Sequence, residues 1–272
     1  MAIHITDPLT ATELPALFLF STDASLAARA VASGVDYIIV DWERGNKLKR
    51  QAGTGFQIGE DTVKDVEELA LGNGLPVFVR VNPLGLDTES EIALALRAGC
   101  QGIMLPMARD REEVSAFLSL IPEGVRTLIQ IETRELATNP LSIVDLPWDF
   151  AHVGLNDLML SRGAPTIWTA VLDGTVEKIC KSLEGRRFGF GGITVVDGGS
   201  PIPARLVILE MSRLGCSMGI LRRSFTADVT GRDIAYEVSA IQRLLEDGSR
   251  RDRNLLEQDR VSLENAIISG SG

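Results

Sequence analysis

Polar side chains interrupt three short hydrophobic runs of this chain, in places where a buried strand would carry only apolar residues. In chain order they are Asp41, Glu43, Arg80, Gln130 and Glu132. Because side chains alternate between the two faces of a strand, Asp41 and Glu43 point the same way, as do Gln130 and Glu132. A charge on a core strand costs free energy unless it is paired or bound to a metal ion. Several such charges on separate strands therefore indicate a functional site.

A further acid, Asp157, follows a later hydrophobic run. The candidate site thus holds the carboxylates of Asp41, Glu43, Glu132 and Asp157 against the single guanidinium of Arg80. Such an excess of negative charge in a cavity is unstable unless carboxyl groups are protonated or a cation binds. All the candidate ligands are oxygens, which suits a hard divalent ion such as Mg²⁺ or Mn²⁺ better than structural zinc.

Two carboxylates leave coordination positions of such a metal open for water and for a chelating substrate. A 2-oxo acid chelates through its keto oxygen and its carboxylate, and the metal then polarises the carbonyl and stabilises an enolate. Arg80 would add positive charge beside the developing oxyanion. Enolate formation from pyruvate or a relative is the half-reaction shared by aldol, Claisen and decarboxylative chemistry.

Each of these residues also has a structural interpretation. Glu132 and Arg80 could form an ion pair that needs no metal, and Asp157 could cap the segment that follows it. His152 is interpreted as a core histidine whose side chain lies lower in the fold than the site. The combination of polar residues at several strand ends favours a functional site over these separate explanations.

The elements that must position these residues alternate along the chain. Hydrophobic runs predict strands at Ala16–Phe20, Tyr37–Glu43, Val77–Asn82, Gly102–Met107, Thr127–Thr133, Phe150–Leu155, Arg187–Thr194 and Met218–Arg223. Amphipathic segments predict helices at Ala24–Ser33, Asp61–Leu71, Thr88–Ala98, Arg111–Leu120, Pro165–Leu183, Pro203–Leu214 and Gly231–Leu245. This order predicts a (β/α)8 TIM barrel, whose active site lies at the C-terminal ends of the strands. An open doubly wound sheet is the alternative, but no Gly-x-Gly-x-x-Gly follows the first strand.

Composition narrows the class of protein. The net charge of −10 and the pI of about 4.8 disfavour nucleic acid as a partner. The three cysteines, Cys100, Cys180 and Cys216, are widely spaced and are expected to be free thiols. The N-terminus lacks the pattern of a signal peptide, and no stretch approaches the ~18 apolar residues of a membrane span. These features predict a cytoplasmic enzyme without a membrane partner.

We expect a barrel domain over residues 1–247 and a C-terminal helix or tail over 248–272, which could pack on the barrel or on a neighbouring subunit. The glycine-containing segment Val196–Pro201 follows the seventh predicted strand, and Arg222 and Arg223 follow the eighth. Barrels often bind phosphate with these two loops. A glycine turn with two surface arginines is the favoured interpretation of this region.

Several motifs together resemble the HpcH/HpaI aldolase/citrate lyase family, which includes the class II pyruvate aldolases and the citrate lyase β-subunits. They are an acidic second strand at Asp36–Gly45, the arginine strand Val79–Pro83, the Ala-Gly-x-x-Gly stretch Ala98–Pro106, Gln130–Thr133 and Gly154–Leu158. The matching segments extend over most of the predicted barrel, and their order and spacing together make the resemblance specific.

The resemblance implies a role for each matching residue. Glu132 and Asp157 would bind the divalent metal, and Arg80 would contact the 2-oxo acid. Gln130 would line the pocket, and the backbone amides of Asn156 and Asp157 would hold the substrate carboxylate. Members of the family are commonly trimers or hexamers, so the resemblance also implies a homo-oligomer.

The chain departs from the pyruvate aldolases at the proton-transferring histidine, because Arg44 follows its acid pair. A guanidinium cannot act as a base near pH 7, so we assign proton transfer to Asp41 or Glu43. The predicted function is a metal-dependent carbon–carbon lyase that acts through the enolate of pyruvate or a related 2-oxo acid. One alternative is a lyase of the citryl-CoA or malyl-CoA kind, with Arg222 and Arg223 on the coenzyme A phosphates. Another is a non-catalytic barrel that binds an oxo acid.

Overall fold

The computed structural model describes residues 14–43 and 61–270, and Arg44 lies outside them. Within these ranges, nine parallel strands form one sheet in the order β7-β6-β5-β4-β3-β2-β1-β9-β8. The strands are β1 Ala16–Phe20, β2 Tyr37–Asp41, β3 Val77–Arg80, β4 Gly102–Leu105, β5 Arg126–Ile131, β6 Phe150–Val153, β7 Phe188–Phe190, β8 Gly192–Ile193 and β9 Met218–Leu221.

The sheet curls into a nearly closed barrel. Its two edge strands, β7 and β8, are consecutive parts of the seventh predicted strand. β7 pairs with β6, whereas β8 pairs with β9, so the two ends of the sheet meet at the break between them. Gly191 occupies the break with a φ of 62°, a backbone conformation that residues other than glycine rarely adopt. The predicted (β/α)8 barrel is confirmed.

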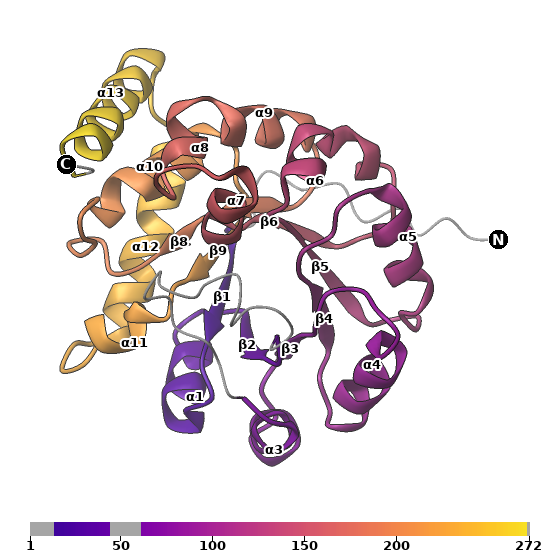
Figure 1. Cartoon of the computed structure of the whole chain (residues 1–272). Helices are drawn as coiled ribbons and strands as arrows, with labels where there is room; N and C mark the ends of the chain where they lie inside the picture. Colours follow the sequence, from indigo (N-terminus) through magenta and orange to yellow (C-terminus); the bar gives the residue numbers. More distant parts are fainter. Residues whose placement is uncertain (1–13, 44–60, 271–272) are drawn as a thin grey trace.

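Helices surround the strands (Figure 1). They are α1 Ala24–Ala32, α3 Val63–Glu67, the π-helix η1 Glu68–Gly72, α4 Thr88–Arg97, α5 Arg111–Ser119, α6 Arg134–Thr138, the 3₁₀-helix η2 Pro140–Ile143, α7 Leu155–Arg162, α8 Thr169–Leu172, α9 Thr175–Ser182, α10 Ala204–Arg213, α11 Ser224–Asp228, α12 Ile234–Ser249 and α13 Arg253–Gly270. The helix predicted over 165–183 is divided into α8 and α9, because Gly174 has a φ of 78° between them.

The lower part of the barrel interior is filled by aromatic and aliphatic side chains. The rings of Phe18 and Phe78 lie 5.3 Å apart in an edge-to-face arrangement, and those of Phe18 and Phe150 lie 5.2 Å apart. Arg80 follows Phe78 by two positions and His152 follows Phe150 by two, so each points into the barrel above an aromatic ring. The hydrophobic floor therefore supports a polar layer nearer the C-terminal ends of the strands.

The predicted C-terminal helix is present as α13, which lies beside α10 at the outside of the barrel (Figure 1). Its Leu263 and Ile267 are buried. Arg260 donates a 2.5 Å hydrogen bond to the buried carboxylate of Glu210 in α10. The helix thus packs on its own barrel, and a contact with a neighbouring subunit stays a prediction. In the described part of the chain, no helix combines the length and apolar character that crossing a membrane requires.

Candidate active site

Arg80 is the centre of the polar layer. Its Nε and Nη2 donate to the two carboxylate oxygens of Asp41, at 2.9 and 2.6 Å, and its Nη1 donates to Gln130 Oε1 at 3.2 Å. Nη1 also lies 3.5 Å from Oε2 of Glu43. Burial opposes the charge on Arg80, but Asp41 and Glu43 outweigh it and raise the pKa of the guanidinium. Arg80 is therefore a permanent cation whose plane is fixed by its partners.

A second guanidinium, that of Arg223, also donates to Asp41. The guanidinium carbons of Arg80 and Arg223 lie 5.0 and 5.4 Å from the ring centre of Phe20. Asp41 is thus bridged by two arginines that share one aromatic neighbour, an arrangement in which cation–π attraction adds to the ion pairs. This contact brings Arg223, expected on the surface, into the site.

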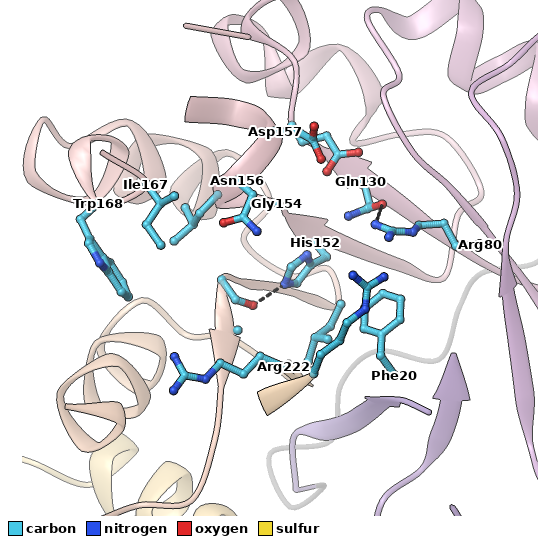
Figure 2. A pocket seen from close by; sticks show the side chains of 16 residues that line it. Phe20, Arg80, Gln130, His152, Gly154, Asn156, Asp157, Ile167, Trp168 and Arg222 are labelled. Carbon is cyan, nitrogen blue, oxygen red and sulfur yellow. Dashed lines mark hydrogen bonds between the residues drawn. The ribbon is translucent and has the colours of Figure 1, made fainter. Parts of the chain in front are cut away.

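The polar layer opens into a pocket with a volume of about 510 Å³. Its lining includes Arg80, Gln130, Glu132, Asn156 and Asp157, so the residues predicted to bind metal and substrate are brought together (Figure 2). The other lining residues are Phe20, His152, Gly154, Leu155, Ile167, Trp168, Gly191, Gly192, Ile220, Arg222 and Arg223.

Asp41 and Glu43, the two acids predicted to transfer protons, lie outside the lining of the pocket. Both are buried, at 1% and 0% exposure. Arg80 contacts both and does line the pocket. The structure therefore places these carboxylates behind a guanidinium as seen from the pocket, and their role in proton transfer stays a prediction.

The pocket contains a second, distinct pair of acids. Glu132 follows β5, and Asp157 lies in the first turn of α7. Burial, together with the negative charges of Asp157 and Glu43, raises the pKa of Glu132 to about 8, against the opposing effect of Arg80. Among the described residues, no group of three or more His, Cys, Asp or Glu side chains gathers closely enough to hold a metal ion. Among the described residues that line the pocket, Glu132 and Asp157 are the two that carry carboxylate oxygens.

The backbone fixes the position of the Glu132 carboxylate. Its Oε1 accepts a 3.0 Å hydrogen bond from the N–H of Met107, a residue with a φ of 57°. Its Oε2 lies against Gly154, where an added Cβ would come within 2.3 Å of that oxygen. Gly154 is also the N-cap of α7. The glycine therefore lets the start of α7, which carries Asp157, approach Glu132 closely.

His152 is a site residue that the sequence interpretation placed elsewhere. It is buried as expected, but its ring lines the pocket, beside Gly154 and Asn156 (Figure 2). Its Nε2 lies 2.7 Å from the carbonyl oxygen of Gly191. Burial, with the nearby charge of Arg80, lowers the pKa of the ring to about 4. The signal was present in the sequence, because the period of two that places Arg80 above Phe78 also places His152 above Phe150.

The far wall of the pocket combines apolar groups with a cation. Ile167 and Trp168 come from the segment after α7, and Arg222 comes from the end of β9. Figure 2 shows Arg222 extending toward the side on which Trp168 lies, away from Arg80. Its Nη2 is 4.0 Å from Asp228, and its Nε is buried with no hydrogen-bond partner among the described residues. This wall offers apolar surface and positive charge to a bound molecule.

Comparisons with known proteins agree with this fold. A family model described as HpcH/HpaI aldolase/citrate lyase matches residues 15–168. The structure of an HpcH/HpaI aldolase from Desulfitobacterium hafniense DCB-2 resembles the chain with a TM-score of 0.58 and 16% identity, over 80% of this chain and 90% of that one. Citrate synthase SbnG gives a TM-score of 0.57 and 17% identity, over 80% and 93%. RipC from Yersinia pestis gives 0.56 and 16%, over 85% and 94%. No curated protein matches the chain.

Proposed function

Because the chain belongs to the HpcH/HpaI aldolase/citrate lyase family, as its motifs predicted, we propose that it is a divalent-metal-dependent carbon–carbon lyase. Its substrate is pyruvate or a related 2-oxo acid, which reacts through an enolate. The observation that carries this proposal is the buried pair Glu132 and Asp157 in one pocket with the fixed cation Arg80.

The carboxylate pair fits a hard divalent ion. Both residues supply oxygen, both line the pocket, and their mutual repulsion is a cost that a bound cation removes. Glu132 and Asp157 would hold Mg²⁺ or Mn²⁺, with the remaining positions open to water and substrate. When bound, such an ion polarises the keto group of an oxo acid and stabilises the enolate.

The other lining residues have complementary tasks. Arg80 presents a guanidinium that Asp41 holds in one plane, which suits stabilisation of an oxyanion without reorganisation. Gln130 is hydrogen-bonded to Arg80 and lines the pocket beside it. Asn156 and Asp157 lie in the first turn of α7, and the N-terminal end of a helix favours a bound anion. Their backbone amides can bind the substrate carboxylate.

Calorimetric titration with pyruvate, with and without Mn²⁺, tests the metal and substrate assignment. The proposal expects binding that requires the metal, and loss of that binding in a Glu132→Gln variant. Glu246→Gln is a matched control, because Glu246 pairs with Arg250 on the surface of α12. Equal pyruvate affinity with and without metal in the wild-type protein would contradict the proposal.

The wall that carries Arg222 and Trp168 favours one alternative, an acyl-CoA as the second substrate. A positive charge in the pocket wall could bind a phosphate of coenzyme A. Acetyl-CoA should then raise the melting temperature, and Arg222→Ala should abolish the shift. Arg205→Ala is the control, because Arg205 lies on the exposed surface of α10, and this variant should keep the shift. No shift at millimolar acetyl-CoA would reject this alternative.

Assembly into a trimer or hexamer stays a prediction, which light scattering can test.

A further inference from the structure

We propose that His152 is the group that accepts the proton removed from the methyl carbon of the bound 2-oxo acid. This inference rests on the proposed function and deepens it, because it names a base for a chain that has Arg44 after its acid pair.

A backbone carbonyl fixes the tautomer of the His152 ring. Nε2 of His152 lies 2.7 Å from the carbonyl oxygen of Gly191 (Figure 2). A carbonyl oxygen can only accept a hydrogen bond, so Nε2 must carry the hydrogen. In a neutral imidazole the other nitrogen, Nδ1, then has a lone pair. His152 is thereby oriented with one nitrogen anchored to the backbone and the other able to take a proton.

The other ring nitrogen, Nδ1, is buried and has no hydrogen-bond partner in the described part of the chain. Leaving a buried acceptor unsatisfied is costly, and such groups in native structures call for an explanation. The ring lines the same pocket as Arg80, Gln130 and Asn156. A ring that lines the pocket and carries a nitrogen acceptor without a partner among the described residues is suited to receive a proton from a bound molecule.

The backbone at Gly191 supports this orientation. The seventh strand breaks there, at a φ of 62°, and an added Cβ would lie 3.2 Å from Leu155 Cδ1. The carbonyl of Gly191 accepts from His152. A glycine in a left-handed conformation at the closure of the barrel thus provides the anchor for the imidazole ring.

The other charged groups in and behind the pocket are less suited to accept the proton. Asp41 accepts hydrogen bonds from two guanidinium groups, and neither it nor Glu43 lines the pocket. Glu132 and Asp157 are assigned to the metal. A guanidinium is not a base at neutral pH. Among the described lining residues, His152 is left as the neutral side chain with a basic nitrogen, and burial keeps it unprotonated at pH 7.

In the enolising direction, a proton moves from the substrate to the ring of His152. The C3–H bond of the oxo acid breaks, its proton goes to Nδ1, its electron pair forms the C2–C3 double bond, and the C2 carbonyl pair moves to oxygen. Arg80 neutralises charge on that oxygen. In the cleavage direction, the substrate is a 4-hydroxy-2-oxo acid, and Nδ1 accepts the proton of its C4 hydroxyl. The O–H electron pair forms the C4 carbonyl of the leaving aldehyde or ketone, the C3–C4 pair forms the C2–C3 double bond of the enolate, and the C2 carbonyl pair moves to oxygen. The resulting imidazolium then returns the proton to C3, which restores the free enzyme.

The test uses two substitutions of His152 in the full chain. His152→Phe keeps a planar ring in place of the imidazole, and His152→Ala leaves a cavity. In Mn²⁺-containing D₂O, both should retain pyruvate binding in calorimetry but lose exchange of the methyl hydrogens by about 10²-fold or more. Added imidazole should restore exchange to His152→Ala and not to His152→Phe. A set of substituted imidazoles should rescue more strongly as their basicity rises.

The outcomes separate the two proposals. If the wild-type protein exchanges the methyl hydrogens and both variants exchange at its rate, the base assignment is rejected and the lyase function stands. If both variants lose exchange together with pyruvate binding, although circular dichroism shows them folded, His152 is a binding residue and the proposal also fails. If the wild-type protein binds pyruvate but exchanges nothing, both proposals fall.

Discussion

Asp41 holds Arg80 through two hydrogen bonds, one to each carboxylate oxygen, at 2.9 and 2.6 Å. Both side chains are nearly inaccessible, with 1% and 8% of their surface exposed. Such a buried bidentate pair fixes the guanidinium plane as well as its charge. The acid that the sequence assigned to proton transfer therefore has a clear task in orienting the cation of the pocket.

An Asp41→Asn variant should lose both stability and activity. The substitution leaves the guanidinium groups of Arg80 and Arg223 beside a neutral amide, and breaking one partner of a buried pair typically costs about 3–5 kcal/mol. Urea unfolding should show a decrease of that order. Asp145→Asn is the control, because Asp145 and Arg111 form an exposed pair, with 65% and 41% of their side chains accessible. That variant should lose little stability, because an exposed ion pair contributes little to folding. Similar losses in the two variants would contradict the orienting role.

A methyl group at position 154 should disturb the carboxylate pair. A Cβ on Gly154 would lie 2.3 Å from Glu132 Oε2, so either Glu132 or the start of α7 must move. We expect Gly154→Ala to weaken Mn²⁺ binding by about tenfold or more, as changes around metal ligands commonly do. The binding is measured by the electron paramagnetic resonance signal of free Mn²⁺.

Gly72→Ala provides the matched control for this substitution. The nearest atom to a Cβ at Gly72 is 3.8 Å away, which is ordinary contact. This variant should bind Mn²⁺ as the wild-type protein does. Unchanged affinity in Gly154→Ala would show that the position of Glu132 is not critical for the metal.

The pH dependence of stability should report the buried His152. Its folded pKa is about 4, below the ordinary value of 6.5, so the unfolded chain binds more protons between these values. Stability is therefore expected to fall as the pH drops from 6.5 toward 4, by up to about 3 kcal/mol from this group. Glu132, whose pKa is raised to about 8, acts in the opposite sense over the range from 4.5 to 8.

Comparison of the wild-type protein with His152→Phe isolates the histidine. The difference between their free energies of unfolding, measured in urea at several pH values, should change between pH 6.5 and 4 and level off outside that range. A difference that does not vary with pH would mean that His152 titrates alike in the folded and unfolded chain.

Local patterns in the sequence predicted much of the fold and part of the site. The alternation of side chains along a strand was sufficient to place Arg80 and Gln130 in one layer, because that layer depends only on strand period and on parallel pairing. The same count placed His152 there, but its side chain was interpreted as part of the floor. The floor is instead formed by Phe150, two residues earlier.

Other features of the site depend on contacts between distant parts of the chain. Arg223 is 182 residues from Asp41, and its expected place after the last strand gave no indication that it would reach that acid. Asp41 is paired with both Arg80 and Arg223, whereas Glu132 and Asp157 form a separate pair in the pocket. The four predicted carboxylates therefore do not form one cluster around Arg80. The break at Gly191, which anchors His152, also arises from the closure of the barrel rather than from a local sequence signal.

The central claim is that Glu132, Asp157 and Arg80 together stabilise the enolate of a 2-oxo acid with the help of a divalent ion. It is tested most directly by proton NMR of pyruvate in D₂O with the purified protein and Mg²⁺. The account predicts that deuterium replaces the methyl hydrogens, that chelation of the metal stops the replacement, and that Glu132→Gln lowers its rate by about 10²-fold or more while Glu246→Gln does not. A wild-type protein that binds Mg²⁺ and pyruvate yet leaves the methyl signal undiminished would contradict it.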